Sequence, residues 1–99
     1  MSQPEPNLTV VIPVHNAAPH LGACVESLLA QSYTDFELIL VENGSSDDSR
    51  ERCARYAAEH PGRIRTLTLD EASVSAARNA GIDNARGRFI TFCLLYTSP

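Results

Sequence analysis

Residues 36–49 read FELILVENGSSDDS and contain, in order, the signs of a strand, a turn and a helix start. Phe36–Val41 is a near-continuous apolar run, typical of a strand that is buried on both faces. Asn43-Gly44 is a frequent turn pair, and the spacing from Ser45 to Asp48 is that of a capping box at a helix N-terminus. The stretch predicts one strand–helix unit of an α/β protein.

Three more segments have a strand pattern. Leu8–Ile12, which Pro13 closes, and Phe89–Phe92 are short apolar runs, and Ile64–Leu69 alternates between apolar and polar residues. The four runs alternate with segments of helical pattern. This order predicts an α/β fold, a Rossmann-like parallel sheet with helices on both faces and right-handed crossovers.

Each intervening segment carries a helix signal. The first has Asn16 as a candidate N-cap and an apolar stripe, and the second is polar and ends at Pro61-Gly62. The third, Ser73–Arg86, is rich in alanine and has Gly87 as a candidate C-cap. The apolar stripes are Leu21, Cys24, Val25, Leu28 and Leu29 in the first helix and Val74, Ala77, Gly81, Ile82 and Ala85 in the third.

Composition and charge argue against several classes of protein. A chain of 99 residues with 43% apolar content suits one small domain, and its net charge of −4 provides no basic patch for nucleic acid. No apolar run approaches the roughly 20 residues of a membrane span. Cys24, Cys53 and Cys93 are an odd number without a CxxC pair, which argues against a disulfide framework and a zinc site. We expect reduced thiols in a cytoplasmic protein.

Residues 1–7 are polar, include two prolines and lack the apolar region of a signal peptide, so we expect a disordered lead. Neither GxGxxG nor GxxxxGK[ST] occurs, which argues against a dinucleotide-binding dehydrogenase and a P-loop NTPase. Ligands of open α/β sheets bind beyond the carboxyl ends of the strands. The candidate site residues therefore follow the predicted strands, at 14–16, 42–45 and 70–71, together with Arg78 on the third helix.

Two stretches, TVVIPVHNAAPHLGACVESLLAQSYTDFELILVENGSSDDS at 9–49 and SAARNAGIDNARGRFITF at 75–92, resemble the start of a family 2-type glycosyltransferase with the GT-A fold. Four spaced elements in them carry the resemblance: VIPVHN, SLLAQSYTDFELILVENGSSDDS, ARNAGI and GRFITF. The resemblance runs from about Leu8 to Phe92. The family usually has Tyr at the position of His15, and often Asp at the positions of Glu42 and Asn43.

The resemblance implies a nucleotide-sugar donor, with a UDP-sugar as the first choice. Pro13 to Asn16 would present backbone groups and the His15 ring to the base. Glu42 and Asn43 would hydrogen-bond the base edge or the ribose, and Arg78 would neutralise a phosphate oxygen. The acceptor would be a saccharide or a lipid-linked glycan, and the longer parent protein would be membrane-associated or purely cytoplasmic.

Each of these residues also has a structural interpretation. His15 would be a loop histidine without function, and Glu42 a solvated loop acid. Asn43-Gly44 would serve only the turn, and Asp47 and Asp48 only the helix N-terminus. Arg78 would form an ion pair with Asp70 or Glu71.

The resemblance also implies parts that this chain does not carry. In the family, the strand that corresponds to Phe89–Phe92 leads into a DxD-type motif that binds Mg²⁺ or Mn²⁺ on the diphosphate, and a later carboxylate acts as the general base of an inverting enzyme. Residues 93–99 are CLLYTSP and contain no carboxylate. We therefore assign this chain no catalytic residue and no metal ligand and expect it to be inactive by itself. The alternative is a non-catalytic nucleotide-binding module without the metal site.

The last seven residues form a separate segment. One reverse translation of Cys93 to Ser98 is TGTCTCTTATACACATCT, the transposon-end sequence that serves as an adapter in sequencing libraries. We therefore divide the chain into the lead at 1–7, the N-terminal part of a glycosyltransferase domain at 8–92, and a non-native tail at 93–99.

Overall fold

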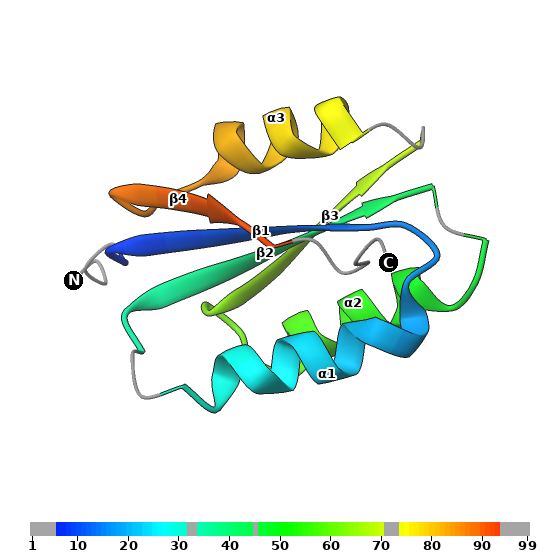
Figure 1. The fold of residues 1–99 in the computed structure, drawn as a ribbon, viewed down its shortest axis with the longest axis horizontal. Coiled ribbons are helices and arrows are strands. Elements are labelled where there is room, and N and C mark those ends of the chain that lie inside the picture. The colour runs from blue at the N-terminus through cyan, green and yellow to red at the C-terminus, as the bar shows by residue number, and fades with distance from the viewer. Residues whose placement is uncertain (1–5, 32–33, 45, 71–73, 94–99) are drawn as a thin grey trace, which may run out of the picture.

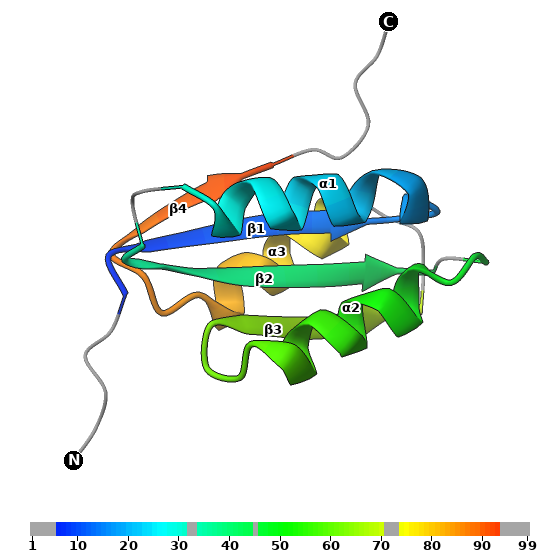
Figure 2. The same ribbon diagram turned by 90° about the horizontal axis from the view of Figure 1, so that it is seen from below.

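The computed structural model describes residues 6–31, 34–44, 46–70 and 74–93. Within these ranges, four parallel strands form one sheet in the order β3-β2-β1-β4. Helices α1 and α2 cover one face of the sheet and α3 covers the other (Figures 1 and 2). This confirms the predicted α/β fold. In chain order the elements are β1 (Leu8–Val14), α1 (Ala18–Leu29), β2 (Phe36–Asn43), α2 (Ser49–Glu59), β3 (Ile64–Leu69), α3 (Val74–Asn84) and β4 (Phe89–Phe92).

The predicted bounds of β3 and β4 are confirmed, whereas β1 and β2 are two residues longer than predicted. Their parallel pairing continues to Val14 opposite Glu42. Pro13 is tolerated inside β1 because of the direction of its backbone. Residues two apart in a strand direct their backbone groups to the same side, and the carbonyl of Val11 accepts the Cys93 N–H at 3.0 Å on the β4 side. The N–H that proline lacks would thus face the side where β4 has ended. The extension brings Pro13 and Glu42 into the sheet.

Alternating residues of the central strands form two cores. Even-numbered side chains such as Ile12, Leu38 and Leu40 face α1 and α2, and odd-numbered ones such as Val11 and Ile39 face α3. All five are fully buried. The parity of a residue in β1 or β2 therefore decides which helical layer it meets.

Helix α3 packs closely on β1 through one glycine. A Cβ on Gly81 would lie 2.4 Å from Val11 Cγ1, so only a residue without a side chain fits there. Ile82, predicted to be in the apolar stripe, is instead 47% exposed. Gly87 is not the C-cap of α3, because the helix ends at Asn84 and a Cβ on Gly87 would lie 2.6 Å from Thr9 N.

The predicted capping box of α2 is wrong. The helix begins at Ser49, so Asp48 occupies the N-cap position instead of the third helical position, and its side chain makes no capping hydrogen bond. Ser45, the other half of the predicted box, lies outside the described residues.

A buried carboxylate stabilises the edge of the sheet at the amino-terminal ends of the strands. Glu37 on β2 is 1% exposed. Its Oε2 accepts Thr9 Oγ1–H at 2.7 Å and Arg86 N–H at 2.7 Å, and its Oε1 accepts Arg65 Nη2–H at 2.9 Å and Arg86 Nη2–H at 3.2 Å. Burial alone would raise the pKa of Glu37, but these hydrogen bonds and the charge of Arg65 hold it below its ordinary value. The network ties the segment before β4 to β1, β2 and β3.

The three thiols are free, and two of them meet. The Sγ atoms of Cys24 on α1 and Cys93 after β4 lie 3.5 Å apart, an approach that the sequence spacing did not indicate. Within the described ranges, no helix combines the length and apolar character that a membrane span needs.

Candidate functional site

The strand order places a ligand crevice at the carboxyl end of β1. The chain moves from β1 to β2 and β3 in one direction, and then returns to add β4 on the other side of β1. Helices α1 and α3 therefore leave the sheet toward opposite faces (Figure 1). A reversal of strand order of this kind opens a crevice beyond the strand ends, where open α/β proteins bind their ligands.

Two loops meet at this edge, the β1–α1 loop and the β2–α2 loop. The exposed His15 donates from Nδ1–H to the carbonyl oxygen of Asn43 at 2.7 Å, which fixes the proton on Nδ1. Asn16 has a positive φ of 49°, and its Oδ1 accepts Ser46 N–H at 2.7 Å, Ser46 Oγ–H at 3.2 Å and Asp47 N–H at 3.3 Å. The sequence predicted Asn16 as the N-cap of α1, and this prediction is wrong: Ala17 holds that position, and the Asn16 side chain binds the neighbouring loop.

The neighbouring loop returns these hydrogen bonds. Asp47 Oδ2 accepts the Ala18 N–H at 3.3 Å and Ser49 Oγ accepts the Ala17 N–H at 3.2 Å, so α1 is capped by residues of the other loop. Asp47 Oδ1 accepts Ser49 N–H at 2.9 Å at the start of α2. The hydrogen bonds of Ser49, with that of Ala18, lower the pKa of Asp47. Asp47 thus serves the N-termini of two helices, whereas sequence reasoning had assigned it to its own.

Glu42 lies inside the sheet, not in a solvated loop. Its side chain is fully buried on the α1–α2 side, and its Oε2 accepts Arg50 Nε–H at 3.2 Å. Burial first, and then the negative charge of Glu42, raises the pKa of the nearby Cys53 thiol to about 12. The interpretation of Glu42 as a solvated acid is wrong. Contact between its carboxylate and a nucleotide stays a prediction.

The remaining candidates lie toward α3. Pro13 and Asn43 are buried and have the parity of the α3 side. Arg78 is exposed on α3 and its guanidinium carbon lies 5.0 Å from the centroid of the Phe92 ring, a cation–π distance. It borders a cavity of about 370 Å³, which is lined by Ser75, Arg78, Asn79, Ile82 and Phe92.

The sequence also offered Asp70 or Glu71 as an ion-pair partner of Arg78, and the structure tests only the first. In the part of the chain that the structure describes, Arg78 has no salt bridge to Asp70. Glu71 lies outside the described residues. Hydrogen bonds between the two loops therefore join His15 to Asn43 and Asn16 to Ser46, whereas Pro13 and Glu42 lie in the strand ends and Arg78 lies on α3.

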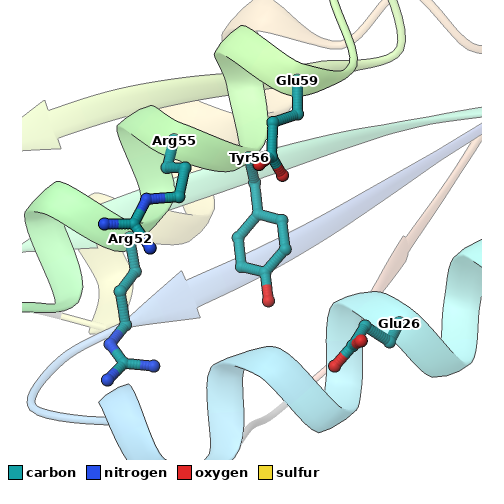
Figure 3. Close-up of a pocket in the computed structure, with 5 residues that line it drawn as sticks. All are labelled: Glu26, Arg52, Arg55, Tyr56 and Glu59. Carbon is teal, nitrogen blue, oxygen red and sulfur yellow. The ribbon is translucent and has the colours of Figure 1, made fainter.

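A second cavity, of about 260 Å³, lies between α1 and α2. Figure 3 shows Tyr56 extending from α2 toward α1, with Glu26 on α1 and the other lining residues on α2. Burial, and then the charges of Glu26 and Glu59, raises the pKa of Tyr56. Two arginines, Arg52 and Arg55, balance the two glutamates, so this cavity has no net charge that would select a ligand.

The described residues do not form a metal site. Over the described ranges, no three His, Cys, Asp or Glu side chains gather in a way that would hold a metal ion. The residues after β4, where the resemblance expects acidic ligands for Mg²⁺ or Mn²⁺, are CLLYTSP. No group among the described residues therefore fits a divalent metal ion, and Mg²⁺ or Mn²⁺ in a longer parent protein stays a prediction.

Comparison with known proteins identifies the chain's relatives. The family model described as "Glycosyl transferase family 2" matches residues 9–93. The uncharacterized glycosyltransferase YibD of Escherichia coli is 41% identical over 85 residues, which are 86% of this chain and 24% of YibD. Across the most similar curated relatives, the chain spans between 10% and 28% of their length.

Solved structures show the same fold. TarS of S. aureus (residues 1–349), in complex with UDP-GlcNAc, superposes with a TM-score of 0.79 at 22% identity, over 89% of this chain and 26% of that one. The mannosyltransferase PcManGT of Pyrobaculum calidifontis, in complex with GDP-Man and Mn²⁺, gives a TM-score of 0.72 at 25% identity, over 82% of this chain and 25% of that one.

Proposed function

Because the chain belongs to glycosyl transferase family 2, we propose that it is the donor-binding part of an enzyme that transfers a sugar from a nucleotide-sugar to an acceptor hydroxyl with inversion. One observation carries the proposal. The loops after β1 and β2 are joined at the carboxyl edge of the sheet, and the His15 ring is held there on the Asn43 carbonyl. This is the edge at which an open α/β sheet binds a nucleotide.

The base of the nucleotide is the first part of the donor to account for. The exposed His15 ring offers an aromatic face for stacking, and Pro13 and Asn43 line the adjoining strand ends. The Asn43 amide can both donate to and accept from a base edge. We propose a UDP-sugar as the donor, a choice supported by the UDP-GlcNAc complex of TarS, while the GDP-Man complex of PcManGT is the competing precedent.

The diphosphate is the second part. Arg78 is the candidate partner, since its guanidinium is exposed beside a cavity and can make charge-assisted hydrogen bonds with phosphate oxygens. Glu42 does not fit the role of general base on the acceptor, because its carboxylate is fully buried and paired with Arg50. The acceptor in a longer parent protein is, by this proposal, a saccharide or a lipid-linked glycan.

We expect the chain of 99 residues to have no transferase activity by itself. The segment after β4, where the resemblance places the acidic metal ligands, is CLLYTSP and has no carboxylate, and the Glu42 carboxylate is fully buried and paired with Arg50. The check is a coupled assay for release of nucleoside diphosphate from UDP-GlcNAc and GDP-Man, with and without Mn²⁺. Metal-dependent release above the no-enzyme rate would contradict this expectation.

Ligand titrations by NMR test the binding proposal. Uridine and UDP are titrated into the wild-type chain, Asn43→Ala and Arg78→Ala, with Arg52→Ala as the control for loss of an exposed arginine on another helix. We expect millimolar binding of UDP, on the order of 4 kcal/mol. Arg78→Ala should weaken UDP about tenfold and leave uridine unchanged, because only UDP has a charge to pair, and Asn43→Ala should weaken both ligands alike.

The titrations have two informative failures. If Arg78→Ala weakens uridine as much as UDP, Arg78 supports the structure and the phosphate assignment is wrong. If the folded wild-type chain binds neither ligand, the donor-binding proposal is wrong.

A further inference from the structure

We propose that Asn16, Asp47 and Ser49 are positioning residues that lock the β1–α1 and β2–α2 loops together and so hold His15 and Asn43 ready for the base. We call their hydrogen bonds across the two loops the loop clamp. The inference rests on the proposed function for its ligand, but the clamp itself is a property of the chain. It also changes the role of Asn16, which the sequence had assigned to nucleotide contact.

The Asn16 side chain already has partners on its oxygen. Oδ1 accepts two backbone N–H groups and one hydroxyl, at 2.7, 3.3 and 3.2 Å, all from Ser46 and Asp47. A carbonyl oxygen has two lone pairs, so three donors leave it no capacity for a base edge. The positive φ of 49° also supports a structural role for Asn16, because Asn adopts this backbone region at less cost than most residues. Both the backbone and the side chain of Asn16 serve the loop contact.

The contacts run in both directions, and each half satisfies groups that would otherwise lack a partner. The N–H groups of Ala17 and Ala18 belong to the first turn of α1, where no helical carbonyl can accept them. No side chain of the helix's own start caps α1, and Ser49 and Asp47 accept these N–H groups at 3.2 and 3.3 Å. Because Asn16 holds Asp47 and Asp47 holds the start of α1, release of one half should loosen the other.

The clamp leads directly to the base-binding residues. His15 precedes Asn16 in the chain, and its ring spans the two loops through the 2.7 Å hydrogen bond to the Asn43 carbonyl. When the clamp holds, both residues are ordered before a ligand arrives. When it is released, binding must also order the two loops, which lowers the affinity for any ligand that uses them. The loss should be the same for uridine and UDP, because His15 and Asn43 are proposed to contact the base, which both ligands share.

Two substitutions of Asn16 separate the effect of its side-chain acceptor from the effect of its backbone conformation. Asn16→Gly keeps the positive φ and removes Oδ1, whereas Asn16→Asp keeps an acceptor at the same place. Amide hydrogen exchange, followed by NMR, reports on each loop separately. In Asn16→Gly we expect faster exchange at Ser46 and Asp47, which lose their acceptor, and also at Ala17 and Ala18, whose own acceptors are unchanged. Asn16→Asp should stay near the wild type.

The same variants are titrated with uridine and UDP. We expect Asn16→Gly to weaken both about fivefold to tenfold, and Asn16→Asp to restore most of the affinity. Asp47→Ala, which breaks the clamp from the other loop, should repeat the Asn16→Gly pattern, with Asp48→Ala as the matched acid that makes none of these contacts. Arg78→Ala, which should weaken only UDP, distinguishes lost positioning from lost charge.

Each outcome has a defined meaning. The inference is overturned if exchange at Ala17 and Ala18 is unchanged in Asn16→Gly, or if exchange rises there and both affinities stay the same. In the second case the donor-binding proposal survives. If the wild type binds neither ligand, the donor-binding proposal fails together with the positioning role, while the exchange data still decide whether the clamp exists.

Discussion

Glu37→Gln removes the charge of the buried carboxylate at the amino-terminal edge of the sheet. The carboxylate accepts hydrogen bonds from Thr9, Arg65 and Arg86, and Thr9 is as fully buried as the carboxylate itself. Glutamine keeps one acceptor oxygen but turns an NH₂ group toward donors. The side chains of Arg65 and Arg86 are 30% and 48% exposed, so water can solvate the charges left behind, and the loss of the charged hydrogen bonds costs about 3 kcal/mol. A domain of this length has about 5–15 kcal/mol of stability in total, so a large part would be lost.

Urea denaturation, followed by circular dichroism, measures the effect. We expect Glu37→Gln to lower the free energy of unfolding by about 3 kcal/mol, more than a hundredfold in the unfolding equilibrium, without a change in slope. Asp48→Asn is the matched control, because the Asp48–Arg52 pair is about half exposed and such pairs contribute about 0–1 kcal/mol. If the two substitutions cost the same, the Glu37 network does not stabilise the fold as argued.

The pH dependence of the same measurement follows from the lowered pKa of Glu37. A carboxyl group whose pKa is lower in the folded state binds its proton more readily when unfolded. Its contribution is therefore complete above the ordinary glutamate value of about 4.3 and is lost as the pH falls below that value toward the folded pKa. Glu37→Gln should flatten this acid limb of the stability curve. An acid limb as steep as that of the wild type would assign it to other carboxylates.

Two further substitutions and one labelling experiment test the packing. Gly81→Ala should cost about 1–3 kcal/mol, because its Cβ would lie 2.4 Å from Val11 Cγ1. Gly22→Ala should be neutral or stabilising by the same urea assay, since its Cβ would meet first the Tyr56 hydroxyl at 3.2 Å; equal costs would contradict the packing argument. Cys53, whose pKa burial raises to about 12, should react with a thiol reagent at pH 8 far more slowly in the folded chain than in urea, and fast labelling of the folded chain would show that the core opens readily.

The fold was largely readable from local pattern. β3 and β4 have the predicted bounds, because apolar runs between turn residues report directly on burial. The ends of β1 and β2 were missed because they depend on tertiary neighbours. Pro13 and Glu42 look like loop residues, but Pro13 faces the side where β4 has ended, and the charge of Glu42 is balanced by Arg50 from α2. Neither the end of β4 nor the position of Arg50 can be read from the residue itself.

The position of the candidate site could be predicted from the sequence, but the hydrogen bonds between its residues could not. The carboxyl edge of the sheet follows from strand order, and His15 and Asn43 do meet there. The partners of Asn16 lie 30 residues away in the chain, and no local spacing indicates them. Asn16 before a helix has the pattern of an N-cap, and only tertiary structure shows that the cap of α1 comes from Asp47 and Ser49. Ser46 and Ser49 were missed for the same reason.

The central place of β1 in the sheet has a consequence for synthesis on the ribosome. Leu8 pairs with Phe36 on one side and with Phe89 on the other, so the two neighbours of β1 emerge far apart in time. At cellular rates of translation the delay between them is roughly 3–10 s. Through that interval a nascent chain presents an apolar strand with one unpaired edge, which neighbouring nascent chains can extend. The yield of folded chain should therefore depend on the density of ribosomes on the mRNA and on how soon a chaperone binds β1. Two variants of equal equilibrium stability could then differ in yield.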